Sequence, residues 1–191
     1  MKVKFAFLFS FFLCFVISMS GQKSPLNEGT YLGLSVQAYP AGIIPTVNLE
    51  TYLNEKSSLL FRLGGNFTDR QDFSDENLTE EGEGFGGSVG FRKHFPLKTG
   101  KIVAGLITDL WSLEIDWTDD IGPNGSILSG TTDILVLQPY LEGGYFLPIK
   151  NSSSQIGLTL GFGREFNIVT DGDEVAQGFI ASIALQFMFG L

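Results

Sequence analysis

The chain has 191 residues, with 12 Lys and Arg against 21 Asp and Glu, a formal net charge of −9, and 24 Gly and 18 Phe. This length predicts one domain. The acidic balance argues against a nucleic-acid-binding protein, because phosphate binding needs clustered Lys and Arg. Abundant Gly and Phe favour a sheet with one crowded face and one face against lipid.

The N-terminus predicts a cleavable secretory signal. A short basic start precedes the apolar run Phe5–Ile17 and the small-residue cleavage site Ser18–Ser20. We therefore expect a signal peptide over residues 1–20 and a mature domain over 21–191. Without the two lysines of the basic start, ten Lys and Arg face 21 acids, a net charge of −11. Cys14 is the only cysteine, so the mature domain is predicted to hold no disulfide.

Eight segments of the mature domain alternate apolar with small or polar residues, the pattern of strands with two different faces. The connections between them alternate between two ends, which predicts an up-and-down meander. In chain order the predicted strands are Tyr31–Tyr39, Ile44–Leu53, Leu59–Thr68, Phe85–Phe95, Ile102–Trp117, Thr132–Phe146, Gln155–Ile168 and Phe179–Leu191.

Two of these strands contain an irregularity. In Ile102–Trp117 the apolar residues change parity, and a slip of one residue predicts a β-bulge near Leu110–Ser112. In Thr132–Phe146, Pro139 has no N–H for the ladder, so we expect a bulge or a local break there.

The last predicted strand has an apolar residue at every second position from Phe179 to Leu191. We expect it to pair with the first strand and close a barrel. It resembles the closing strand of outer-membrane β-barrels, although Leu191 stands where an aromatic residue is usual. With its turn lengths included, the mature chain resembles the small eight-stranded barrels of the OmpX family and the OmpA membrane domain.

Periodicity alone leaves open which face points outward, because a soluble lipocalin-like barrel also alternates, with its apolar face inside. The composition of the polar face indicates that the apolar face points outward. The polar face carries small residues rather than the charged residues of a solvated surface. These small residues are Gly33, Ser35, Gly64, Gly86, Ser88, Gly90, Gly144, Gly157, Gly161 and Gly163. The predicted fold class is therefore all-β, an eight-stranded antiparallel up-and-down transmembrane β-barrel.

The resemblance implies a bacterial outer-membrane protein. It implies export, folding by the outer-membrane assembly machinery, and a monomer in contact with the lipid bilayer and lipopolysaccharide. No cofactor is predicted. The fold does not fix the activity.

The few charges on the predicted interior face have opposite signs. A buried charge must be paired, so we expect an Arg–Glu network that fills the lumen and leaves no open pore. Its predicted members are Glu50, Arg62, Arg92, Glu142 and Glu165. Asp109 is predicted to be a further lumen residue or part of a small site.

Three acidic segments, Asp69–Glu83, Thr118–Thr131 and Val169–Val175, are predicted to be loops at the extracellular end. Neither Asp72–Asn77 nor Asp171–Glu174 has the spacing of a twelve-residue calcium loop, so we expect solvated acidic loops and no metal site. Their candidate binding residues are Asp69, Asp72, Asp75, Glu76, Glu80, Glu81, Asp119, Asp120, Asp171, Asp173 and Glu174.

His94 is the only histidine and the only candidate general base. No nearby serine in the sequence completes a nucleophile pair, so we expect a lumen or rim residue bonded to a neighbour. Aromatic residues towards the strand ends predict girdles at the lipid–water boundary. They are Tyr31, Tyr39, Tyr52, Trp111, Trp117, Tyr140 and Tyr145.

These features predict a non-enzymatic outer-membrane barrel that anchors acidic loops for adhesion, envelope integrity or partner binding. Three alternatives remain: a narrow channel, a soluble barrel that binds an apolar ligand, and a lipid-modifying enzyme that uses His94.

Overall fold

The computed structural model describes residues 29–71, 77–119 and 126–191. The predicted signal peptide with Cys14 lies outside these residues. So do four predicted acidic positions, which are Asp72, Asp75, Glu76 and Asp120.

The described chain is built from strands. In order they are β1 (Thr30–Tyr39), β2 (Gly42–Asn54), β3 (Ser57–Gln71), β4 (Thr79–Pro96), β5 (Lys101–Asp119), β6 (Leu128–Pro148), β7 (Gln155–Arg164), β8 (Phe166–Asp171) and β9 (Phe179–Gly190). No helix among the described residues is long and apolar enough to cross a membrane.

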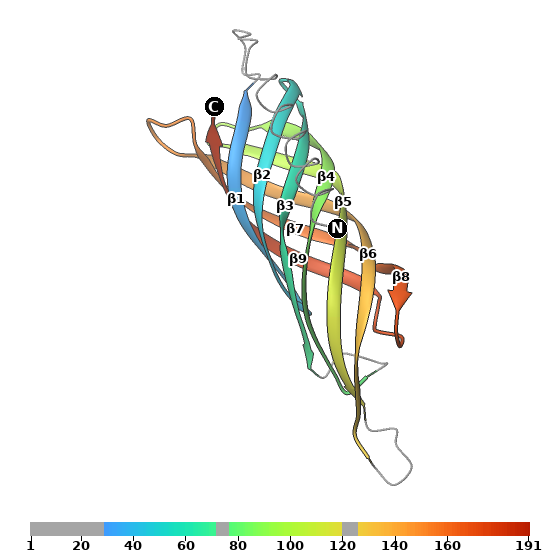
Figure 1. The fold of residues 1–191 in the computed structure, drawn as a ribbon. Helices are drawn as coiled ribbons and strands as arrows, with labels where there is room; N and C mark the ends of the chain where they lie inside the picture. The colour runs from blue at the N-terminus through green and yellow to red at the C-terminus, as the bar shows by residue number, and fades with distance from the viewer. Residues whose placement is uncertain (1–28, 72–76, 120–125) are drawn as a thin grey trace.

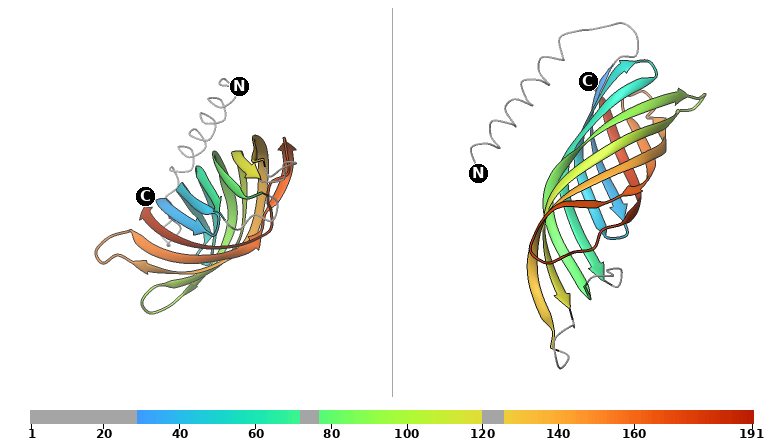
Figure 2. Two further views of the ribbon diagram at one scale, coloured as in Figure 1. Left: turned by 90° about the horizontal axis from the view of Figure 1, so that it is seen from below. Right: turned by 90° about the vertical axis from the view of Figure 1, so that its right-hand side faces the viewer.

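Each strand pairs antiparallel with its neighbours, and the sheet closes on itself (Figures 1 and 2). β1 pairs with β2 on one side and with β9 on the other, so the first and last strands meet, with Leu34 opposite Phe187. β7 and β8 both pair with β6 and together make one crossing of the barrel wall. The predicted eight-stranded barrel is therefore confirmed as eight antiparallel passes.

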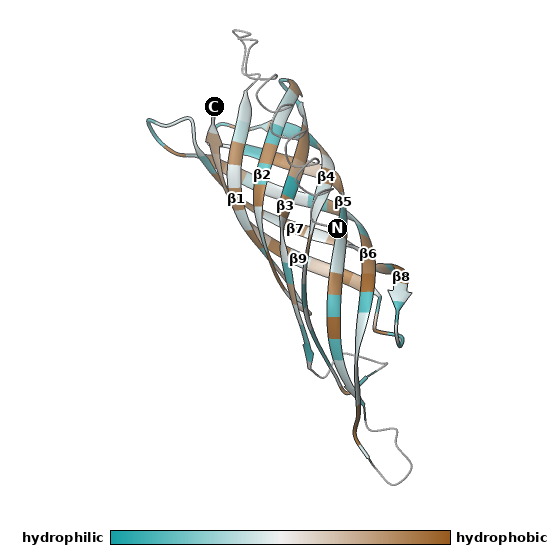
Figure 3. Cartoon of the chain, viewed as in Figure 1, coloured by the Kyte–Doolittle hydropathy of each residue, from teal (hydrophilic) through white to brown (hydrophobic). Residues whose placement is uncertain are grey.

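Most apolar residues lie on the outside of the barrel and most polar residues of the strands on the inside. Leu34, Leu141 and Leu158 are 58%, 66% and 50% exposed, whereas the inward-facing Asn48 and Gln186 are 0% exposed. Figure 3 shows the resulting alternation of hydrophobic and hydrophilic residues along the strands. This is the arrangement of a transmembrane barrel, and the reverse of a soluble barrel with an apolar cavity.

Glycines on the inner face make room for large side chains in the lumen. A Cβ atom on Gly86 would lie 2.6 Å from the ring of Trp111, and one on Gly157 would lie 2.3 Å from the ring of Phe146. Both rings are fully or almost fully buried. The small residues of the inner face therefore allow aromatic side chains to fill a narrow barrel.

The predicted bulge near Leu110–Ser112 is wrong. β5 keeps one register against both β4 and β6 along its whole length. The apolar parity changes because the outer half of the lumen holds an apolar cluster, so the inward positions there are apolar as well. The cluster consists of Ile44, Trp111, Leu113, Ile115, Ile134, Val136 and Val175.

The predicted irregularity at Pro139 is confirmed as a local break. Pro139 pairs with Thr108 of β5, but on its other side the pairing of β6 passes from Tyr140 with β7 to Leu137 with β8. The missing N–H of Pro139 thus falls where the seventh pass of the barrel is interrupted.

The predicted acidic loops are shorter than expected, because the strands continue into them. β3 runs to Gln71, β4 starts at Thr79, β5 runs to Asp119 and β6 starts at Leu128. β1 and β2, in contrast, are joined directly after Tyr39 by a two-residue turn. One side of the barrel wall, made of β3 to β6, therefore extends well beyond the other (Figure 2).

The predicted aromatic girdle is mostly wrong. Trp111 and Tyr140 are buried in the lumen, and Tyr39 is bonded there to Asn66 and Thr68. Of the predicted girdle residues, Tyr145 lies on the outer face, opposite the outward-facing Ile102 and Leu158. The hydroxyl groups of Tyr39 and Tyr140 have partners in the lumen, whereas that of Tyr145 bonds to Thr99 in the turn after β4.

The assignment of the exposed apolar residues to a lipid-facing surface is testable by placing a charge among them. Leu158→Arg should destabilise the barrel by about 2–4 kcal/mol, because the guanidinium would lie in the hydrocarbon region. The measurement is urea unfolding in phospholipid vesicles. Leu97→Arg, in the short turn between β4 and β5, is the control and should change stability little. Equal effects at both positions would contradict a lipid-facing β7.

Candidate functional site

Arg92 on β4 forms the lumen layer nearest the short turns. It is 0% exposed and donates to both oxygens of Glu142, from Nε (2.8 Å) and Nη2 (3.1 Å). Nη1 donates to Glu50 (3.0 Å) and Nη2 also donates to Gln186 (3.1 Å). One guanidinium therefore links β4 to β2, β6 and β9 across the lumen, in bonds strengthened by charge.

Arg62 on β3 forms the next layer outward. Its Nη2 donates to Asp109 Oδ1 at 2.8 Å and also bonds to the hydroxyl of Tyr140. Gln37 and Ser88 accept from the other guanidinium nitrogens at 3.1 Å each. Since Arg62 is 2% exposed, side chains fill the lumen cross-section at this level.

Arg70, further out on β3, forms a third layer. It donates to Glu165 at 2.6 Å and to Glu80 at 3.2 Å, and it also bonds to the backbone oxygen of Ala176. The backbone N–H of Ala176 donates to Glu80 in turn (3.0 Å). These bonds hold the segment between β8 and β9 against the wall, with Val175 in the outer apolar cluster.

The structure brings together some of the predicted lumen residues and separates others. Arg92, Glu50 and Glu142 form one group, whereas Arg62 pairs with Asp109 and Glu165 pairs with Arg70. Arg70 was not predicted to be a lumen residue, because it falls in the segment Asp69–Glu83 that was predicted to be an acidic loop. Continuing the alternation of β3 from Arg62 and Thr68 by one further step would have placed it on the inner face.

His94 lies in the lumen, 2% exposed, beside a serine that sequence reasoning missed. Ser58 Oγ lies 2.7 Å from His94 Nε2 and donates to Glu50 Oε1 at 2.5 Å. The expectation that no serine lies near His94 is therefore wrong, since pairing of β3 with β4 sets Ser58 beside Arg92. Glu50 approaches the same ring nitrogen as Ser58 (3.2 Å), and Tyr52 approaches the other (3.3 Å).

This arrangement differs from a nucleophilic triad, in which the carboxylate binds the imidazole nitrogen remote from the serine. Ser58 is 0% exposed, so its hydroxyl is closed to a substrate in this conformation. His94, Ser58, Glu50 and Tyr52 instead extend the hydrogen-bond network of Arg92 to the short-turn end.

The outer face of the β3–β6 extension carries carboxylates on neighbouring strands. Asp69 of β3 lies opposite Glu81 of β4, and Glu81 lies opposite Asp116 of β5. In a second row Glu83 of β4 lies opposite Glu114 of β5, which lies opposite Asp133 of β6. We call these six residues the acidic ladder.

The carboxylates of the acidic ladder are exposed and close together. Directly opposite residues have Cβ atoms about 4.5–5.5 Å apart, and like charges at that spacing are destabilising. In the described part of the chain, no Lys, Arg or His forms an ion pair with them. Glu83, Glu114, Asp116 and Asp133 were missed as site residues because only the strand register shows that they are neighbours.

The other predicted acidic residues occupy different places. Glu80 faces the lumen and binds Arg70, so it is no loop residue. Asp119 ends β5, and Asp173 and Glu174 are exposed in the connection to β9. Asp171 ends β8 and lies opposite Asp133, at the edge of the acidic ladder. The described residues contain no group of three or more His, Cys, Asp or Glu that could hold a metal ion.

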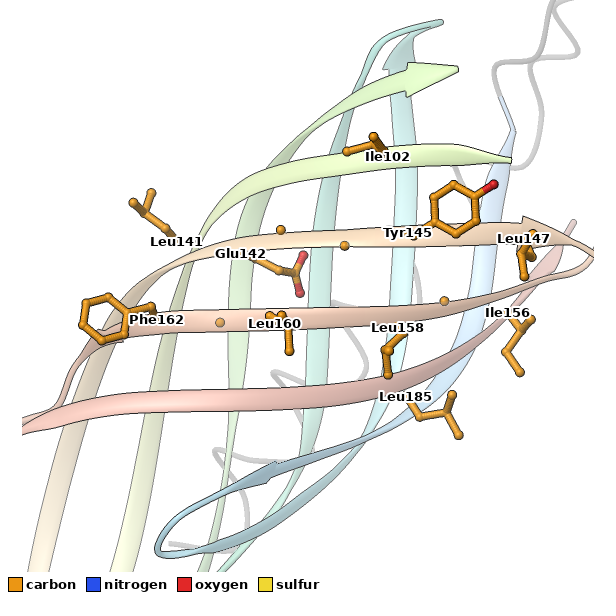
Figure 4. Close-up of a pocket in the computed structure, with 14 residues that line it drawn as sticks. Ile102, Leu141, Glu142, Tyr145, Leu147, Ile156, Leu158, Leu160, Phe162 and Leu185 are labelled. Atoms are coloured by element: carbon orange, nitrogen blue, oxygen red, sulfur yellow. The ribbon is translucent and has the colours of Figure 1, made fainter. Parts of the chain in front are cut away.

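A groove of aliphatic and aromatic side chains runs along the outside of β6 and β7 (Figure 4). Leu141, Leu158, Leu160 and Phe162 line it, and a Cβ atom on Gly143 would meet nothing within 4 Å. The groove belongs to the apolar belt that faces lipid.

The chain forms a closed antiparallel β-barrel of eight passes, and solved structures of small outer-membrane β-barrels are similar to it. No family model and no curated protein matches its sequence. Similar solved structures include the N-terminal β-barrel domain of Pseudomonas aeruginosa OprF. This match has 12% sequence identity and a TM-score of 0.45, and it covers 85% of this chain and 98% of that chain. Neisserial surface protein A matches with 11% sequence identity and a TM-score of 0.47, over 85% of this chain and 94% of its own. Acinetobacter baumannii CarO has 13% identity, 88% and 100% coverage and a TM-score of 0.42.

The role of the Arg92 layer is testable by unfolding. Arg92→Met should destabilise the barrel by about 3–5 kcal/mol, because it leaves the carboxylates of Glu50 and Glu142 buried without a charged partner. The measurement is the guanidinium unfolding midpoint in detergent micelles. Lys150→Met, in an exposed turn, removes the same charge and should leave the midpoint unchanged.

Adding Glu50→Gln and Glu142→Gln to Arg92→Met should restore part of the lost stability, because no unpaired charge then remains. An unchanged midpoint in Arg92→Met would contradict a network that holds the wall together.

Proposed function

We propose that this protein is a non-enzymatic barrel of the bacterial outer membrane that binds a positively charged partner through the acidic ladder. The observation that carries this proposal is the register, which sets carboxylates directly opposite one another on four neighbouring strands. Such rows oppose folding unless cations lie near them. A cationic partner supplies the missing charge and gains affinity and rate from it.

The position of the ladder supports an extracellular role. It lies towards the ends of β3 to β6 that are opposite the short turns, where carboxylates begin to replace exposed apolar residues and Phe67 still lies opposite Glu83. In barrels of this kind the short turns face the periplasm and the longer connections face outward. The ladder then stands above the outer leaflet, where adhesion or partner binding takes place.

A dispersed electrostatic surface fits the ladder better than a metal centre. Its six carboxylates spread over four strands, and they form no group of metal-binding geometry within the described residues. The proposed partners are a basic segment of another macromolecule and lipopolysaccharide, whose phosphates would share divalent cations with the ladder. The bilayer and the outer-membrane assembly machinery complete the proposed set of partners.

The ladder is testable by neutralising one of its rows. Glu83→Gln, Glu114→Gln and Asp133→Asn together should weaken the binding of a ten-residue lysine peptide by about tenfold at low salt. The same variant should unfold at higher denaturant concentration, because repulsion between facing charges is removed. The measurements are titration calorimetry and urea unfolding in lipid nanodiscs.

The matched control for the row variant removes three acids that lie outside the ladder. They are Asp173→Asn and Glu174→Gln in the connection between β8 and β9, and Glu55→Gln in the turn between β2 and β3. This control should bind the lysine peptide nearly as the unmodified protein does. Equal losses in both variants would reduce the effect to net charge and reject the ladder as the binding surface.

The channel alternative has its own test. Because Arg62 and Arg92 are buried in paired layers, the lumen is filled, and planar bilayers containing the protein should show no stepwise conductance. Steady single-channel steps from the unmodified protein would contradict a closed barrel and favour a conduit.

A further inference from the structure

A pocket of about 330 Å³ opens at the short-turn end of the barrel, opposite the acidic ladder. Its lining comes from six strands and the turn between β4 and β5. The main lining residues are Tyr31, Tyr52, His94, Lys101, Phe146 and Gln155. The filled lumen lies beneath this pocket, so the pocket is closed at its inner end and does not lead through the barrel.

Gln155, the first residue of β7, brings an unsatisfied donor to this pocket. The residue is 7% exposed, and its Nε2 has no hydrogen-bond partner. A buried amide N–H without an acceptor costs about 1–3 kcal/mol. Among the buried side-chain atoms of residues 29–71, 77–119 and 126–191 that lack a partner, this donor is the one that belongs to a residue lining the pocket, where an acceptor from outside the chain can reach it.

Lys101, the first residue of β5, brings a positive charge to the same pocket. Its Nζ lies over the rings of Tyr52 (4.9 Å), Tyr31 (5.5 Å) and Phe146 (5.6 Å), and it donates to the hydroxyl of Tyr52. Among the described residues no carboxylate forms an ion pair with it. The aromatic rings therefore fix an ammonium group that keeps N–H donors to spare.

The pocket is held in place by the lumen network. Tyr52, which accepts from Lys101, also lies 3.3 Å from His94 Nδ1 and stacks on the His94 ring. His94 contacts Glu50, and Glu50 is paired with Arg92. The donors of the pocket thus stand on side chains that are fixed before any ligand arrives, which lowers the entropy lost on binding.

We propose that this pocket binds an oxyanion, a carboxylate or phosphate group of a small molecule or chain end at the periplasmic face. The anion accepts hydrogen bonds from Gln155 Nε2 and from Lys101 Nζ. Lys98 adds a second positive charge at the rim, against one carboxylate, Glu55, in an exposed turn. The volume exceeds that of the anionic group alone, so the rings of Tyr31 and Phe146 leave room for a small organic body.

The experiment is an NMR titration of the full-length folded barrel in detergent micelles, with sodium acetate and inorganic phosphate as separate probes. Sodium chloride keeps the ionic strength constant. The side-chain amide of Gln155 and the backbone amide of Lys101 should shift and saturate. In Gln155→Leu and in Lys101→Met, the affinity should fall at least tenfold. Lys150→Met removes a charge at the same end outside the pocket and should bind as the unmodified protein does.

The two probes distinguish the sources of the anion. Saturation by acetate alone assigns a carboxylate, saturation by phosphate alone assigns a phosphate group, and saturation by both assigns a general oxyanion site; each supports the proposal. Shifts that stay linear with both probes, or that fall as much in Lys150→Met as in Lys101→Met, would overturn it. Gln155→Leu keeps the test valid if Lys101→Met fails to fold.

Discussion

The structure depends on the rule that a buried charge must have a partner. Three arginines on two adjacent strands, Arg62 and Arg70 on β3 and Arg92 on β4, point into a lumen too narrow for bulk water. Their carboxylates come from β2, β4, β5, β6 and the break between β7 and β8. Except for Glu80, which lies opposite Arg70 on the adjacent strand, these partners come from strands that do not pair with the strand of their arginine. Satisfying the charges therefore also fixes the barrel as closed and sets the relative height of its strands.

Apolar clusters separate the arginine layers, so the lumen is packed as a protein core. Leu60, Ile107, Tyr140 and Ile180 form one cluster, and the larger one around Trp111 fills the outer half. Glycines on the inner face give these side chains their space. The exterior, by contrast, needs only to be apolar. Shape is therefore specified inside the barrel, where packing and pairing both act.

The sequence was enough to predict eight antiparallel passes and the outward apolar face, because both follow from alternation along single strands and from the turns between them. The meeting of β1 with β9 was predicted separately, because closure leaves no open strand edge. Contacts between strands could not be predicted, because they depend on register. The pairing of Ser58 with His94 and the facing carboxylates of Glu83 and Glu114 are examples. The prediction of a bulge near Leu110 was wrong for a related reason. Apolar residues that face the lumen give the same sequence pattern as a strand whose apolar face has switched sides.

The barrel wall has unequal height, so two opposite sides of the molecule differ above the level of the turn between β1 and β2. β1 and β2 end at the two-residue turn after Tyr39, whereas β5 and β6 pair as far as Asp119 and Leu128. A molecule approaching along the membrane surface would contact the extended, charged wall of β3 to β6 on one side. On the other side it would meet only the short wall of β1 and β2. For the proposed binding surface, rotation of the barrel about the membrane normal would decide which neighbours the acidic ladder can reach.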